Sequence, residues 1–180
     1  MATGDVFFQD VKPTESPRGS VVPPGCRTEE VNGEQILRIP INVTEVETPI
    51  IFPSFTIVIE STKLSISGDA IVDAALYAAA VRAPNTDLTA DRELEVTGLM
   101  QVHSVHGRIV RGGRIEALRI DADLSVRATE TLVAKQVNVL DGSIRTPKLV
   151  TSDFSGDNQA IQTFSWNAAA DEVPDWLQNC

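Results

Sequence analysis

The sequence predicts an all-β fold, a parallel β-solenoid with about fifteen residues per coil over residues 64–153. Three observations support this prediction. Apolar residues recur at a step of fifteen, and within each coil they alternate with polar residues at a spacing of two, as in strands that bury one face. Small residues recur at one phase of the same step, where a coil would turn a tight corner.

The repeat is clearest in the column that starts at Leu64. An apolar residue followed four positions later by a small one fits an inward-facing strand and a corner, and stacked coils bury such columns continuously. We therefore expect Leu94, Ile109 and Leu124 to stack. The apolar column is Leu64, Ala79, Leu94, Ile109, Leu124 and Val139, and the small column is Gly68, Ala83, Gly98, Gly113, Ala128 and Ser143.

Two alternative structures fit parts of this pattern. Fifteen residues also make about four helical turns, and the Ala-rich stretch 69–83 has helical propensity, so a helix is the competing expectation for that segment. Glycines and prolines across the block, among them Gly98, Gly113, Pro84 and Pro147, argue against a helix over its whole length. A β-sandwich with hairpins is the alternative fold.

The flanks differ from the repeat block. Residues 1–33 contain four prolines and four glycines with little periodicity, and predict an extended N-terminal arm. Residues 34–63 alternate apolar and polar positions, as at Phe55, Ile57 and Ile59, and predict N-terminal strands or a cap. Residues 154–180 combine aromatic side chains with four acids and no base, and predict an acidic aromatic tail.

The net charge of −10 lies mainly in the flanks. Nine acids against five bases give −4 for residues 1–63, twelve against ten give −2 for 64–153, and four against none give −4 for 154–180. This sign disfavours nucleic acid as a partner. No apolar run reaches the roughly 18 residues of a membrane span. The residues after Met1 lack the features of a secretory signal, so we expect a protein of the cytoplasm or of an assembled particle.

The sequence predicts no enzyme and no cofactor. His103 and His106 have no cysteine nearby and would point to opposite faces of a strand, so we expect surface histidines and no metal site. The predicted fold resembles hexapeptide-repeat acyltransferases in architecture only. Clustered carboxylates serve catalysis in β-helical glycosidases, but on a short solenoid we expect them to solvate the outer face. The acids considered are Asp73, Asp87, Asp91, Glu93, Asp121 and Asp123.

A basic stretch and the tail supply the candidate partner-docking residues. Residues 103–119 contain four arginines, both histidines and a single acid, Glu116. Ion pairs with acids of neighbouring coils are the simpler interpretation, and a docking face for an acidic segment such as the tail is the functional one. Tryptophan in the tail would bury a large area on a partner, although the segment from Phe154 to Trp166 could equally cap the solenoid. The predicted docking residues are Arg108, Arg111, Arg114, Arg119, Phe164, Trp166, Trp176 and Leu177.

These features predict a non-enzymatic structural subunit of a homo- or hetero-oligomeric particle, such as a virion, phage tail or similar scaffold, with tails that clamp neighbours. The ends of a solenoid expose strand edges that need caps or become joining surfaces. One alternative is a cytoskeletal filament protein similar in architecture to the bactofilins, which are β-helical rods with Pro-rich tails, although no specific bactofilin motif occurs. The other is a small carbohydrate-binding or carbohydrate-active β-helix.

Overall fold

The computed structural model describes residues 21–155, 161–162, 165–167 and 174–178, and most of them are in strands. The strands are β1 (Arg27–Val31), β2 (Glu34–Ile39), β3 (Glu45–Val46), β4 (Ile50–Ile59), β5 (Lys63–Ile66), β6 (Ala74–Ala90), β7 (Glu93–Val139), β8 (Ser143–Arg145), β9 (Lys148–Ser155), β10 (Ile161–Gln162) and β11 (Ser165–Asn167). A short helix, α2 (Asp175–Gln178), lies near the C-terminus.

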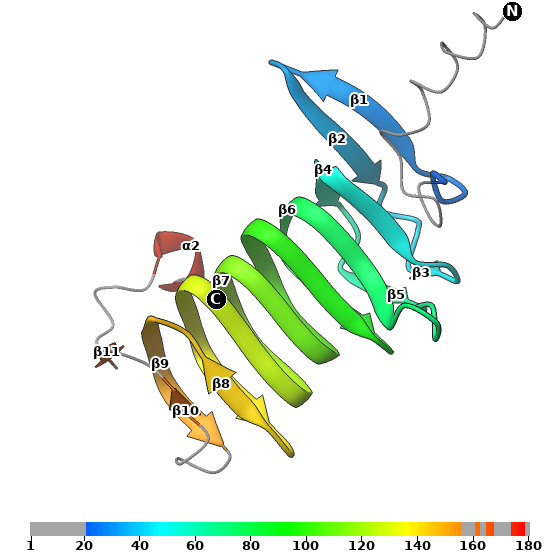
Figure 1. Ribbon diagram of the computed structural model, residues 1–180. Helices are drawn as coiled ribbons and strands as arrows, with labels where there is room; N and C mark the ends of the chain where they lie inside the picture. The colour runs from blue at the N-terminus through cyan, green and yellow to red at the C-terminus, as the bar shows by residue number, and fades with distance from the viewer. Residues whose placement is uncertain (1–20, 156–160, 163–164, 168–173, 179–180) are drawn as a thin grey trace, which may run out of the picture.

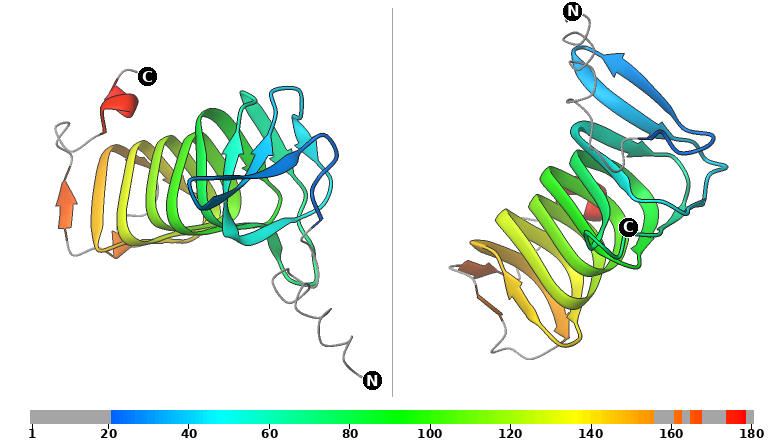
Figure 2. Two further views of the ribbon diagram at one scale, coloured as in Figure 1. Left: turned by 90° about the horizontal axis from the view of Figure 1, so that it is seen from above. Right: turned by 45° about the vertical axis from the view of Figure 1, so that its right-hand side comes forward.

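The strands from β2 onward stack in parallel. β2 pairs with β4, β4 with β6, β6 with β7, and β7 with both β8 and β9. Figures 1 and 2 show the coils as a single row. The fold is a β-solenoid of about six turns with stacked positions about 19 residues apart, so the predicted solenoid is confirmed. A sandwich of hairpins would instead require antiparallel neighbours throughout.

The predicted coil length of fifteen residues is too short for most of the coils. Paired positions are 20 residues apart between β2 and β4, 24 to 26 apart between β4 and β6, 17 to 19 apart between β6 and β7, and 17 apart between β7 and β9. The register shifts at several points, for example between Ala83 and Asp87. Coil length varies because an extra residue at a bulge or corner leaves the stacked strands on either side in place.

The predicted column of Leu94, Ile109 and Leu124 does not form. Leu94 is buried and pairs with Leu76 of the preceding coil, whereas Leu124 is 37% exposed. A step of fifteen does describe the contact between Gly98 and Gly113. A Cβ built on Gly113 would lie 2.9 Å from the carbonyl oxygen of Gly98, so these two small residues face each other on adjacent coils.

The core is a stack of aliphatic side chains inside the coils. Buried and exposed positions alternate along much of β6 and β7, which is the pattern of a strand with one face inward. Residues 69–83 do not form a helix, because Asp69 bridges to Ala74 across a short loop and β6 then continues to Ala90. The largest side chains with less than 2% exposure are Leu37, Ile39, Ile50, Ile57, Leu64, Leu76, Leu88, Leu94, Met100, Ile115, Ile120 and Leu132.

An antiparallel hairpin covers the N-terminal end of the stack. β1 pairs antiparallel with β2, and the two residues between them, Asn32 and Gly33, have φ values of 53° and 83°. Positive φ at both central positions is the geometry of a tight hairpin turn that Asn-Gly favours. Residues 27–33 of the expected extended arm therefore belong to this hairpin, while residues 1–20 lie outside the described part of the chain.

Parallel stacking also continues beyond residue 153. In β10, Ile161 pairs with Ile144, and in β11, Trp166 pairs with Leu149, each at an offset of 17 residues. Part of the segment expected as a separate tail thus adds strands to the last coil. This places Trp166 at the C-terminal end of the solenoid.

Candidate functional site

Each of the four arginines of the basic stretch lies beside a carboxylate. The four N–O distances are between 2.6 and 3.1 Å, so these guanidinium groups form ion pairs within the chain. The local positive charge is therefore largely balanced, and partner docking by these arginines stays a prediction. The pairs are Arg108 with Asp73, Arg111 with Glu93, Arg114 with Glu116 and Arg119 with Asp121.

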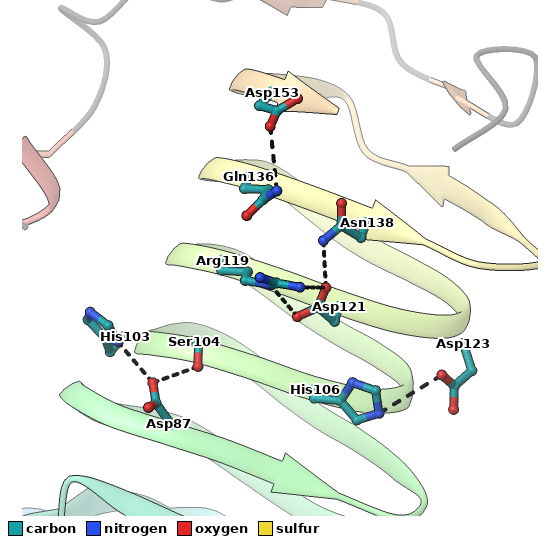
Figure 3. A network of polar contacts seen from close by, with 10 residues as sticks. All are labelled: Asp87, His103, Ser104, His106, Arg119, Asp121, Asp123, Gln136, Asn138 and Asp153. Carbon is teal, nitrogen blue, oxygen red and sulfur yellow. Dashed lines mark hydrogen bonds and ion pairs between the residues drawn. The ribbon is translucent and has the colours of Figure 1, made fainter. Parts of the chain in front are cut away.

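Both histidines also have acidic neighbours, on one polar face of the coils (Figure 3). His103 Nδ1 lies 2.9 Å from Asp87 Oδ1, and Ser104 donates a hydrogen bond to the same oxygen. The hydrogen bond from Ser104 has the largest effect on the pKa of Asp87, followed by the one from His103. Together they lower this pKa by more than burial raises it. His106 Nε2 is 3.9 Å from Asp123 Oδ1, on another coil. The two histidines thus serve separate contacts.

The same face continues as a ladder of amides and carboxylates. Asn138 donates a hydrogen bond to Asp121, which also accepts from Arg119, and Gln136 contacts Asp153 at 3.5 Å (Figure 3). A shallow groove of about 520 Å³ runs along it. The groove presents hydrogen-bonding groups of both kinds, which suits a polar ligand such as a glycan. Its lining consists of His106, Arg119, Asp121, Ala122, Asp123, Asn138, Val139 and Leu140.

A second group of charges surrounds Asp73. This residue has a φ of 56°, ends the loop before β6 and accepts hydrogen bonds from Arg92 and Arg108. Its side chain also contacts Glu93. Burial is the largest cause of the raised pKa of Glu93; the neighbouring Asp73 raises this pKa further, and the positive charge of Arg111 lowers it in part. Of the six acids considered for catalysis, Asp73 and Glu93 are therefore adjacent, while Asp87 and Asp121 are held by the separate partners described above.

The C-terminal helix α2 packs against the outside of the coils (Figures 1 and 2). Leu177 is 0% exposed and packs against Val133 and Val150, with Leu118 and Trp176 at the edge of the same cluster. None of these side chains belongs to the interior core. We call Glu116, Leu118, Val133 and Val150 the anchor patch.

Trp176 adds a polar contact to the anchor patch. Its Nε1 donates a hydrogen bond of 2.9 Å to Glu116 Oε2, which also accepts one from Gln101, while Arg114 bonds the other oxygen at 2.6 Å. Burial would raise the pKa of Glu116, but the hydrogen bonds from Trp176, Arg114 and Gln101 together lower it. The tail thus meets the one acid of the basic stretch through a tryptophan.

The structure brings together only some of the predicted docking residues. Arg114 lies beside the anchor patch with Trp176 and Leu177, whereas Arg108 pairs with Asp73 in a different cluster. Trp166 is in β11, and Phe164 lies outside the described residues. The patch itself was not predicted from the sequence. The sequence feature that marks the patch is a break in the apolar–polar alternation of the strands. Leu132-Val133 and Leu149-Val150 place apolar residues on both faces of two paired strands.

Comparison with protein-family models, with curated proteins and with solved structures finds no significant match. In the described ranges, no three histidine, cysteine, aspartate or glutamate side chains lie close enough to hold a metal ion. None of the described helical segments has the length and hydrophobicity needed to traverse a bilayer.

Proposed function

We propose that the chain is a structural subunit of a larger homo- or hetero-oligomeric particle, such as a virion, a phage tail or a similar scaffold, and acts without catalysis. A stack of coils in which every strand hydrogen-bonds to the next is a stiff rod suited to such a role. The segments that flank the rod are the parts that clamp neighbouring subunits.

The N-terminal hairpin is the observation that carries this proposal. In a filament of the bactofilin type, rods join end to end through their terminal coils. Here β1 runs antiparallel to the stack and carries Glu29 and Glu30, and Arg38 ties Glu29 to Glu60. A charged edge strand disfavours the addition of another strand. The hairpin thus argues against a filament that grows end to end through this edge, and supports assembly through other contacts.

Size and shape of the assembly test the proposal. Light scattering and negative-stain microscopy of the full chain should give discrete oligomers of one size at micromolar concentration. Glu29→Val with Glu30→Thr removes the edge charges and should allow end-to-end growth, while Glu45→Gln, at an exposed position of β3, is the matched control. Filaments of the unmodified chain would instead support the bactofilin-like alternative. A chain that stays monomeric at all concentrations would refute a homo-oligomeric particle.

Carbohydrate binding is the second candidate, and the groove beside His106 supports it. Carboxylates and amides along adjacent coils can accept and donate hydrogen bonds to sugar hydroxyls. Screening the full chain against a panel of glycans, with Asn138→Ala as the groove variant, tests this function. Binding that is lost in the variant supports it, and the absence of any binding refutes it.

A further inference from the structure

We infer that the anchor patch is a docking site for the Trp176–Leu177 segment of a second copy of this chain. This inference rests on the proposed function, because it names the contact through which a tail clamps its neighbour. The patch is already shaped for this segment, since the chain's own tail lies on it.

The apolar part of the contact explains why the patch needs a cover. Val133 and Val150 are paired residues of β7 and β9, and they point away from the interior core. Without Leu177 these valines and Leu118 would form an exposed apolar strip on the side of the rod. Exposed apolar strips on soluble rods mark sites where another chain binds.

The polar part of the contact explains why the site selects tryptophan. Glu116 is 5% exposed and receives donors from Gln101, Arg114 and Trp176. The first two come from the rod, and among the described residues the indole N–H is the donor that the tail contributes. A tail with phenylalanine at position 176 would leave a buried carboxylate oxygen short of one donor, and such losses are costly. The pair of a tryptophan and the following leucine is therefore the recognition element.

The contact can form equally well between two copies. α2 spans only Asp175–Gln178, and its burial on the rod comes through Trp176 and Leu177. A neighbour's tail would make the same contacts. Whether a patch holds its own tail or a neighbour's tail therefore depends on the effective concentration of each. Exchange of an identical element between copies is a low-cost route to assembly. In a particle, where neighbours are close, a neighbour's tail reaches an effective concentration at which it competes with the chain's own tail.

A complementation experiment with full-length chains tests the inference. The acceptor carries Trp176→Ala and Leu177→Ser, which leaves its anchor patch open. The donor carries Val133→Lys, which blocks its own patch but keeps its tail. Far-UV circular dichroism and thermal melting establish that both variants are folded. Each variant alone should lack the tail contact, and mixing them should give a two-chain species in analytical ultracentrifugation.

Controls separate this inference from the proposed function. Adding Trp176→Phe to the donor should weaken the mixed species about tenfold, the effect of one lost hydrogen bond. A peptide of residues 168–180 should compete with the donor for the acceptor, which gives a second readout if Val133→Lys proves unfolded. If the unmodified chain forms particles but the mixture and the peptide show no binding, the docking site is wrong and the assembly role stands. If the unmodified chain is also monomeric, the docking site and the homo-oligomeric particle are both refuted.

Discussion

Gly113 is the position where one added methyl group tests the stacking of the coils most directly. A Cβ at this position would lie 2.7 Å from the carbonyl oxygen of Thr97 and 2.9 Å from that of Gly98. Carbon–oxygen contacts between strands are ordinarily about 3.3 Å or longer, so the two coils would have to separate by about 0.6 Å. Both neighbours are backbone atoms that also take part in the stack, and they cannot rotate away.

The cost of Gly113→Ala follows from this geometry. Overpacking of a well-packed interior by one methyl group costs about 1–3 kcal/mol. For a chain of this size, each kcal/mol lowers the melting temperature by about 2–4 °C, so we expect a drop of about 2–12 °C. Gly113→Val adds two further carbons between the same coils and should cost several times the roughly 0.5 kcal/mol of a surface change. Gly98→Val should behave similarly, because its Cβ would lie 2.8 Å from the oxygen of Ala79.

Thermal and urea unfolding followed by far-UV circular dichroism measures this effect. Gly107→Ala is the matched control, because the nearest atom to its Cβ is the side-chain Cδ1 of Leu94 at 3.2 Å, which can move. We expect Gly107→Ala to shift the melting temperature less than Gly113→Ala. If the two variants melt alike and close to the unmodified chain, Gly113 does not lie against Gly98, and the pairing of these two coils is wrong.

Three further predictions concern the acids and the tail. The folded pKa of Glu116 is below its ordinary value of 4.5, so the stability that this carboxylate contributes is complete above pH 4.5 and is lost as the pH falls through the folded pKa. The difference in melting temperature between the unmodified chain and Glu116→Gln should therefore shrink below pH 4.5. Ser104→Ala removes the main hydrogen bond that lowers the pKa of Asp87, so this pKa, measured by carboxyl carbon NMR, should rise, and an unchanged value would contradict the contact. Leu177→Ala should lower the free energy of unfolding, measured with urea, by about 2 kcal/mol, the low end for a buried leucine because the patch lies at the surface. The control Leu140→Ala, at a position 76% exposed, should have little effect.

The amino-acid sequence by itself determined the fold class. Alternating apolar residues with few aromatics require thin strand layers with one buried face, and small residues such as Gly98 and Gly113 require close approach between neighbouring coils. These are local properties of the chain, so they can be recognised without knowing which coil lies next to which. The Asn32-Gly33 turn is another local signal, because a tight hairpin turn with positive φ at both central positions favours Asn-Gly.

Only the tertiary structure decided the coil length and the contacts between coils. The offset between the parallel strand pairs described above ranges from 17 to 26 residues, because corners absorb insertions that leave the strands aligned, and a fixed step therefore misassigns Leu124. The anchor patch depends on that register. Val133 and Val150 become one surface only when their coils are paired at an offset of 17, and Glu116 meets Trp176 across 60 residues of chain. Contacts at such separation are set by how the coils stack, which no local pattern records.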